Sequence, residues 1–176
     1  NVDVTSITAY RANDSDYGSD SDYNSLEFLK NVYQNVDIRT FTQELRLNYE
    51  VSDKVDVMVG GFYFDESIDQ DSGLLYGDDT RTYIDLLAGG ASVLGGVEAI
   101  LGYAPGTFFA DDTTIDEYAT QDNEALSLFG QAEFDVTDRL TATFGVNYTQ
   151  DKKNVSLYTE NNDVFGNIDF SGAEGR

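Results

Sequence analysis

The stretch 39–64, RTFTQELRLNYEVSDKVDVMVGGFYF, decides the fold class. Large or apolar side chains alternate with mostly polar ones over 39–49, and alternation resumes over 55–64 after the polar break 50–54. A period of two is that of a β-strand, whose successive side chains point to opposite faces of a sheet. The stretch therefore predicts a hairpin whose more apolar face carries Phe41, Gln43, Leu45, Leu47, Tyr49, Val55, Val57, Val59, Gly61 and Tyr63.

The same pattern returns over 123–151, with a turn at 136–139. One face of this second hairpin carries Leu126, Leu128, Gly130, Ala132, Phe134, Leu140, Ala142, Phe144, Val146 and Tyr148. A fifth strand is predicted over 2–12, where the set of Val4, Ser6, Thr8 and Tyr10 competes with Thr5, Ile7, Ala9 and Arg11 for the apolar side. The tail 155–170 can hold one more strand. The pattern predicts an all-β chain of about five antiparallel strands.

The connections between these strands are of two kinds. The turns within the hairpins are short, whereas 13–36 and 68–122 are predicted as long acidic loops. Long loops without structure are uncommon in compact domains, but bacterial outer-membrane barrels combine short periplasmic turns with long extracellular loops. The connections therefore favour strands of a transmembrane outer-membrane β-barrel.

Aromatic residues at both ends of the apolar face support this interpretation. Phe41, Tyr63 and Tyr148 lie toward the predicted loops, and Tyr49 and Phe134 lie toward the turns. Aromatic girdles flank the apolar band of membrane barrels. At roughly 3.3 Å per residue and a tilt of about 40°, the run from Phe41 to Tyr49 spans about 20 Å, close to the band height of about 25 Å.

Composition excludes several classes of function. The chain has 33 acidic and 10 basic residues, a net charge of -23, and neither His nor Cys. Such a surface repels phosphate backbones, so we expect no binding of nucleic acid. A Ser-His-Asp triad and a thiolate site cannot be built, and no other catalytic constellation is visible, so we expect no enzyme. The acidity fits either divalent cations of a lipopolysaccharide layer or a saline habitat.

Several segments, in order, resemble the barrel strands of TonB-dependent receptors. The stretch 41–47 (FTQELRL) is similar to the family's "SQELRL" strand, and 59–64 (VGGFYF) to its return strand. The stretch 128–134 (LFGQAEF), followed by 137–140 (TDRL), resembles "LFGQAEYDLTDRL". The stretch 144–149 (FGVNYT) resembles "LGLRYT", with Asn147 where Arg is usual, and 6–11 (SITAYR) and 151–153 (DKK) also fit. The resemblance covers most of the chain except 68–122.

This resemblance implies a barrel of about 22 strands with an N-terminal plug. Residues 1–176 would then be a partial β-barrel domain, from which the plug is absent, and an excerpt of a longer chain. The implied function is energy-coupled uptake across the cell outer membrane of a ferric siderophore, haem, cobalamin or oligosaccharide. The implied partners are outer-membrane lipid, the nutrient, and the TonB complex through the plug. Two alternatives stay open: a passive porin-like barrel, and a soluble or secreted self-associating β-protein with a binding or structural role.

Three groups of residues outside the strand pattern are candidates for a site. Asp14, Asp16, Asp20 and Asp22 surround a Gly-containing segment and are a calcium candidate, or else a solvated loop. The apolar, Gly-rich stretch 84–103 predicts a short helix, whose continuity the Gly pairs 89–90 and 95–96 weaken, or a patch that contacts substrate or a partner. Glu44 and Arg46 share the polar face and predict a structural ion-pair network with each other's neighbours or with the plug, rather than a transport relay. No other cofactor is expected.

Overall fold

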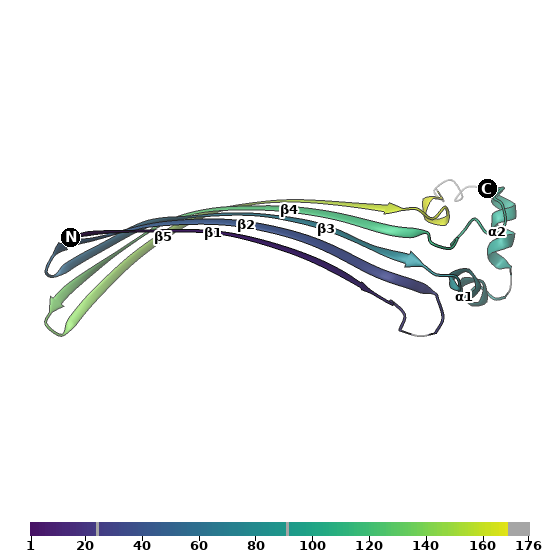
Figure 1. The fold of residues 1–176 in the computed structure, drawn as a ribbon, viewed down its shortest axis with the longest axis horizontal. Coiled ribbons are helices and arrows are strands. Elements are labelled where there is room, and N and C mark those ends of the chain that lie inside the picture. The colour runs from purple at the N-terminus through teal and green to yellow at the C-terminus, as the bar shows by residue number, and fades with distance from the viewer. Residues whose placement is uncertain (24, 91, 169–176) are drawn as a thin grey trace, which may run out of the picture. The chain divides into compact units, whose positions relative to one another are not determined.

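The computed structural model describes residues 1–23, 25–90 and 92–168. Its strands are β1 (Val2–Ser19), β2 (Leu29–Ser52), β3 (Val55–Tyr76), β4 (Thr114–Thr137) and β5 (Leu140–Asn161). They form one antiparallel sheet in the order β1-β2-β3-β4-β5, so each strand pairs with its neighbours in the chain (Figure 1). Helices α1 (Thr80–Leu87) and α2 (Val93–Leu101) connect β3 to β4, and a 3-10 turn, η1 (Phe165–Asn167), follows β5. The all-β prediction and the five strands are confirmed.

The strands are longer than the sequence pattern predicted. Residues 13–19 belong to β1, 29–36 to β2, 68–76 to β3 and 114–122 to β4, although all were predicted as loops. The prediction was wrong there because backbone hydrogen bonds hold a strand whether its side chains are apolar or acidic. Hydrophobic alternation marks only the part of a strand that faces an apolar medium or core.

Two other boundaries also differ. The turns comprise 53–54 and 138–139 and are tighter than the predicted 50–54 and 136–139. Of the strand predicted in the tail 155–170, residues 155–161 form the end of β5, whereas 162–168 are not in a strand. Residues 169–170 lie outside the described residues.

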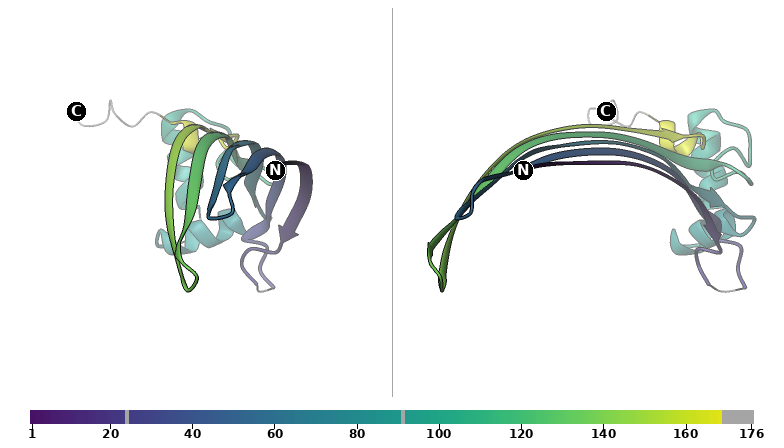
Figure 2. Two further views of the ribbon diagram at one scale, coloured as in Figure 1. Left: turned by 90° about the vertical axis from the view of Figure 1, so that its left-hand side faces the viewer. Right: turned by 60° about the vertical axis from the view of Figure 1, so that its left-hand side comes forward.

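The chain divides into two compact units, and every strand contributes to both. Unit 1 comprises Asn1–Asp14, Asp37–Asp69 and Thr120–Ser156, and therefore contains the two tight turns. In the part of unit 1 that the structure describes, no hydrophobic side chain is buried. Its strands lie side by side as a single layer (Figure 2).

Hydrogen bonds in unit 1 identify the face of β1 that continues the more apolar face of β2. The Gln43 amide donates to the Ser6 hydroxyl at 3.1 Å, and the Thr8 hydroxyl donates to the Gln43 carbonyl oxygen at 2.5 Å. Gln43 shares the face of Phe41 and Leu45. The set Val4, Ser6, Thr8 and Tyr10 therefore belongs to the more apolar face.

Unit 2 comprises Ser15–Val36, Gln70–Ala119 and Leu157–Arg176. It holds the connection 20–28 and both helices, and its described part contains the buried hydrophobic residues Leu94 and Phe108. The Phe108 ring contacts Tyr103 at 5.2 Å and Phe165 at 5.4 Å between centroids. This small aromatic core fixes the helical segment against the end of β5.

The Gly-rich stretch forms two helices. Gly89 and Gly90, with φ of 110° and 147°, lie between α1 and α2 and break the helical path. The second pair, Gly95 and Gly96, lies within α2. The helical path therefore ends at the first pair and continues through the second, since a helix tolerates a Gly that is not required to adopt positive φ.

Candidate functional site

The first candidate surface is the apolar face of unit 1. Large hydrophobic side chains from all five strands are exposed on it: Val2, Val4, Tyr10, Phe41, Leu45, Leu47, Tyr49, Val51, Val59, Tyr63, Leu126, Leu128, Phe134, Val136, Leu140, Phe144, Val146 and Tyr148. Side chains near the middle of β5 are the most open, with Phe144 at 68% and Val146 at 73% exposure. A contiguous exposed apolar surface of this kind marks contact with a membrane or with another protein.

Neighbouring side chains on this face pack against each other. The rings of Phe41 and Tyr63 are 6.4 Å apart, and those of Phe134 and Phe144 are 6.2 Å apart. A Cβ placed on Gly61 would lie 3.4 Å from Leu128. The face is therefore a continuous layer of side chains across β2 to β5.

Charged residues replace apolar ones beyond the aromatic row of Tyr10, Phe41, Tyr63 and Tyr148. Arg39 pairs with Asp37 at 2.8 Å, and Lys152 with Glu124 at 3.6 Å. The Tyr63 hydroxyl donates to Asp65 at 3.1 Å. Tyrosine places an apolar ring and a polar tip across such a boundary. The apolar face thus has a defined edge, where hydroxyl and charged groups begin.

The opposite face of unit 1 carries a polar network together with a few apolar residues, among them Phe62, Phe64 and Phe129. Glu66 accepts from the Thr40 hydroxyl and from the Asn123 amide, each at 3.1 Å. The hydroxyls of Ser127 and Thr149 are 2.8 Å apart. Glu44 forms an ion pair with Arg46 of the same strand, whereas the sequence predicted an ion-pair network with their neighbours or the plug. The hydroxyl, amide and carboxylate groups of Thr40, Glu66, Asn123, Ser127 and Thr149 hydrogen-bond across strands on this face.

One aromatic ring on this polar face lies directly over a glycine. A Cβ on Gly60 would be 2.5 Å from the Phe129 ring and 2.8 Å from the Leu45 carbonyl oxygen. Any larger residue at position 60 would displace one of them. The glycine therefore lets the ring cover the backbone of β3.

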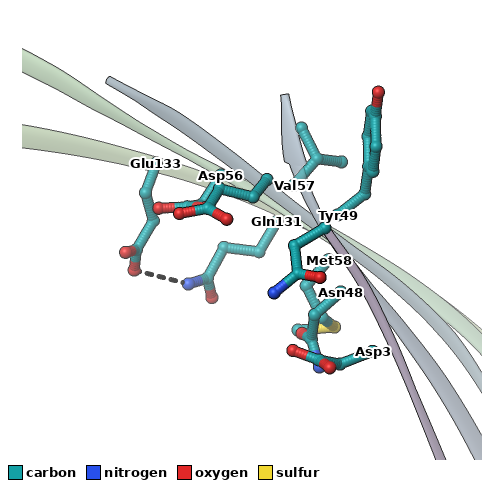
Figure 3. A pocket seen from close by; sticks show the side chains of 10 residues that line it. Asp3, Asn48, Tyr49, Asp56, Val57, Met58, Gln131 and Glu133 are labelled. Carbon is teal, nitrogen blue, oxygen red and sulfur yellow. Dashed lines mark hydrogen bonds between the residues drawn. The ribbon is translucent and has the colours of Figure 1, made fainter. Parts of the chain in front are cut away.

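A hollow of about 530 Å³ opens on unit 1 near the turns (Figure 3). Its lining includes the carboxylates of Asp3, Glu50, Asp56 and Glu133 and the sulfur of Met58. In Figure 3 the amide of Gln131 bonds to Glu133, at 2.9 Å. The hollow is acidic and half open, so its chemistry suits water and cations better than anions.

The predicted calcium residues are not gathered into one cluster. Asp14 and Asp16 are exposed on β1, whereas Asp20 and Asp22 lie in the connection 20–28. Asp20 accepts from the backbone of Asp22 at 3.1 Å, and Asp22 accepts from the backbone amides of Phe28 and Leu29 at 3.1 and 3.2 Å. Among the described residues, no group of three or more possible ligands is arranged to hold a metal ion. The carboxylates of Asp20 and Asp22 accept hydrogen bonds from backbone amides and so stabilise the connection 20–28.

Unit 2 holds a buried ion pair that the sequence reasoning did not single out. Arg81 on α1 donates to both oxygens of Glu98 on α2, at 2.7 and 2.6 Å. Glu98 is fully buried and also accepts from the backbone amides of Phe108 and Gly106, at 2.8 and 3.1 Å. These hydrogen bonds, led by Arg81, lower the pKa of Glu98 to about 2. The signal in the sequence was the lone charged residue within VLGGVEAIL.

A second polar cluster in unit 2 surrounds Asp116, which is 7% exposed. The Tyr33 hydroxyl donates to it at 2.5 Å, the Thr114 hydroxyl at 2.7 Å and the Asn162 amide at 3.0 Å. The hydrogen bond to Asp116, with burial, raises the pKa of Tyr33 to about 12. The Tyr33 ring lies where a side chain on Gly73 would be, since a Cβ there would meet it at 2.6 Å. The cluster links β2 and β4 to Asn162, the residue after β5, and both oxygens of the Asp116 carboxylate accept hydrogen bonds.

Within the described chain, neither helix combines the length and the apolar character needed to cross a membrane. Comparison with models of protein families gives no match, and comparison with curated proteins gives none either. The two faces of unit 1 are therefore the features from which we infer a function.

Proposed function

We propose that the chain is part of the wall of an outer-membrane β-barrel. The observation that carries this proposal is the distribution of side chains in unit 1, where most of the exposed large apolar residues occupy one face and the hydrogen-bonded polar network lies on the other, beside a few apolar residues such as Ile7, Phe62 and Phe129. A soluble sheet buries its apolar face against a second layer. A membrane barrel leaves it to lipid and turns its polar side chains inward.

The finer part of the proposal is a receptor for energy-coupled nutrient uptake. It is supported by the strand segments that resemble TonB-dependent receptors, especially 41–47, 59–64 and 128–140. In this proposal 1–176 is one stretch of a barrel of about 22 strands, with a plug elsewhere in the polypeptide. The nutrient is a ferric siderophore, haem, cobalamin or an oligosaccharide. Calcium at Asp14, Asp16, Asp20 and Asp22 stays a prediction.

Lipid contact can be tested residue by residue because the chain has no Trp. A single Trp at Leu128 faces the apolar side, and a matched Trp at Ser127 faces the polar side. The polypeptide is reconstituted in phosphatidylcholine vesicles with brominated acyl chains, which quench nearby indole fluorescence. We expect strong quenching for Leu128→Trp and weak quenching for Ser127→Trp. Equal, weak quenching of both would exclude a lipid-facing wall and favour the soluble, self-associating β-protein.

The receptor class needs a separate measurement. The intact mass of the native polypeptide, taken from the outer-membrane fraction, should be several times 19.4 kDa. Limited proteolysis should then release a globular plug from the barrel. A large barrel without a plug would favour the passive porin, and a mass of 19.4 kDa in a soluble fraction would contradict both barrels.

A further inference from the structure

We propose that unit 2 carries a docking surface for an arginine-bearing peptide segment of a partner protein, centred on Tyr118 and Tyr158. The tyrosine patch is defined by these two rings and the carboxylates of Asp71 and Glu160. This inference does not depend on the barrel proposal, since all four residues belong to unit 2 and the argument uses only their local chemistry.

The aromatic part of the patch is exposed and ordered across two strands. Tyr118 on β4 and Tyr158 on β5 have ring centroids 6.2 Å apart and planes inclined by 25°. Their exposures are 40% and 60%, so both retain accessible ring surface. The faces of aromatic rings attract cations through their quadrupole, and arginine is the side chain found most often in such contacts.

Carboxylates surround these rings. Asp116 and Glu160 lie two residues from Tyr118 and Tyr158 on the same strands, so their side chains share the face of the rings. Burial raises the pKa of the Tyr118 phenol, and the negative charges of Asp116, Glu160 and Asp71 raise it further. Asp116 is buried and already bonded to Tyr33, Thr114 and Asn162. Asp71 and Glu160 are exposed and available to a ligand.

Unit 2 does not supply a cation of its own to this patch. In its described part the cationic side chains are Lys30 and Arg81, and they pair with Asp112 and Glu98 at 2.9 and 2.6 Å. The patch is therefore complementary in charge to an external cation. Guanidinium fits it better than ammonium, because the planar group stacks on a ring while its N–H groups bond to carboxylates.

A single contact of this kind is weak at an exposed surface, so the ligand must present several. Cation–π contacts and exposed ion pairs are each modest, and linked contacts gain strength through effective concentration. A peptide with adjacent arginines meets this need, whereas a lone small cation does not.

The test is binding of a hexa-arginine peptide to the full chain in nonionic detergent, measured by isothermal titration calorimetry at 0.15 M salt. We expect Tyr118→Leu and Tyr158→Leu each to weaken binding about fivefold, with Phe at either position retaining affinity because the ring is kept. Glu160→Gln and Asp71→Asn should also weaken it. Tyr148→Leu, which removes an exposed tyrosine from β5 in unit 1, is the matched control and should bind as the parent does.

Two results would overturn the proposal. Unchanged affinity in both Leu variants, with loss only in the charge variants, would reduce the effect to general attraction by an acidic surface. Equal loss in Tyr148→Leu would place the peptide elsewhere on the chain. Circular dichroism of each variant separates these outcomes from unfolding, and the conservative Phe variants give a second reading if a Leu variant does not fold.

Discussion

At the scale of single residues, Glu98 is a buried carboxylate that accepts hydrogen bonds from both a side chain and the backbone. Each carboxylate oxygen accepts from Arg81 and from a backbone amide of the segment that follows α2. A buried carboxylate is costly unless its charge is neutralised and its oxygens are bonded, and here both conditions are met. The Arg81–Glu98 pair connects α1, α2 and the segment around Phe108. It therefore stabilises the helical segment.

Removing this charge should destabilise unit 2. Glu98→Gln leaves the partly exposed guanidinium of Arg81 without its counter-ion, and we expect a loss of about 3 kcal/mol in the free energy of unfolding. The measurement is urea denaturation followed by circular dichroism at the helix band. Glu117→Gln, at an exposed carboxylate, should change little. Similar effects of both variants would contradict a special role for Glu98.

The same site fixes a pH dependence. The pKa of Glu98 falls on folding from about 4.5 to about 2, so the folded state favours the charged form. Its stabilisation is complete above pH 4.5 and is lost as the pH falls toward 2. The difference in stability between the parent and Glu98→Gln should therefore be flat above pH 4.5 and shrink below it. A difference that persists at pH 2 would assign the effect to packing rather than charge.

At the scale of elements, the sequence predicted the strands but not their ends. Alternation in 39–64 and 123–151 located β2 to β5, because one face of those segments is apolar and the other polar. It missed the ends 68–76 and 114–122, where the apolar residues are few or adjacent, as Leu74 and Leu75 are, and do not alternate with polar ones. Those residues are held by hydrogen bonds to neighbouring strands, which a single-sequence pattern does not reveal.

The candidate site likewise has a part that the sequence predicted and a part that it did not. The apolar face and its aromatic residues follow from the alternation and could be predicted. The Arg81–Glu98 pair and the Tyr118–Tyr158 pair join residues distant in sequence or on separate strands, so pairing register and helix packing had to be known first. The aspartates from Asp14 to Asp22 are close in sequence, but Asp14 and Asp16 belong to β1 and Asp20 and Asp22 to the connection that follows it, which spacing along the chain did not reveal.

The assignment of faces on β5 makes a prediction about a single strand. Val146 is on the apolar face and its neighbour Asn147 is on the opposite one. If lipid covers the apolar face, Val146→Lys should cost about 2–4 kcal/mol of stability in the membrane, since a charge at depth is expensive. Asn147→Lys, one residue away, should cost little.

The measurement is urea-driven unfolding of both variants in phosphatidylcholine vesicles. Equal stability of Val146→Lys and Asn147→Lys would contradict a lipid-covered face. A large loss for Asn147→Lys alone would reverse the assignment of the two faces, and β5 would then turn its polar side to the lipid.

At the scale of the whole sheet, two features favour different surroundings. The acidic residues favour water, whereas the exposed apolar face favours a nonpolar medium or a protein partner. A net charge of -23 makes copies of the chain repel one another in water, which opposes association through the charged regions. The apolar face of unit 1 would drive association in water, because neighbouring copies could cover it. Charged residues along one part of each strand and apolar residues along another fit the proposed barrel wall, which would contact both water and lipid.

The edges of the sheet give the last prediction. Within the described chain β1 and β5 are the outer strands, and each offers one row of backbone groups to a further strand. Lipid cannot satisfy such groups, so in a barrel wall both edges must pair with other strands of the polypeptide. In vesicles, amide hydrogens of β1 and β5 within unit 1 should then exchange as slowly as those of β3. Fast exchange at alternate residues of β5, with β3 protected, would reveal an open edge. That result is incompatible with a closed wall, and it would favour a sheet that adds strands by self-association in water.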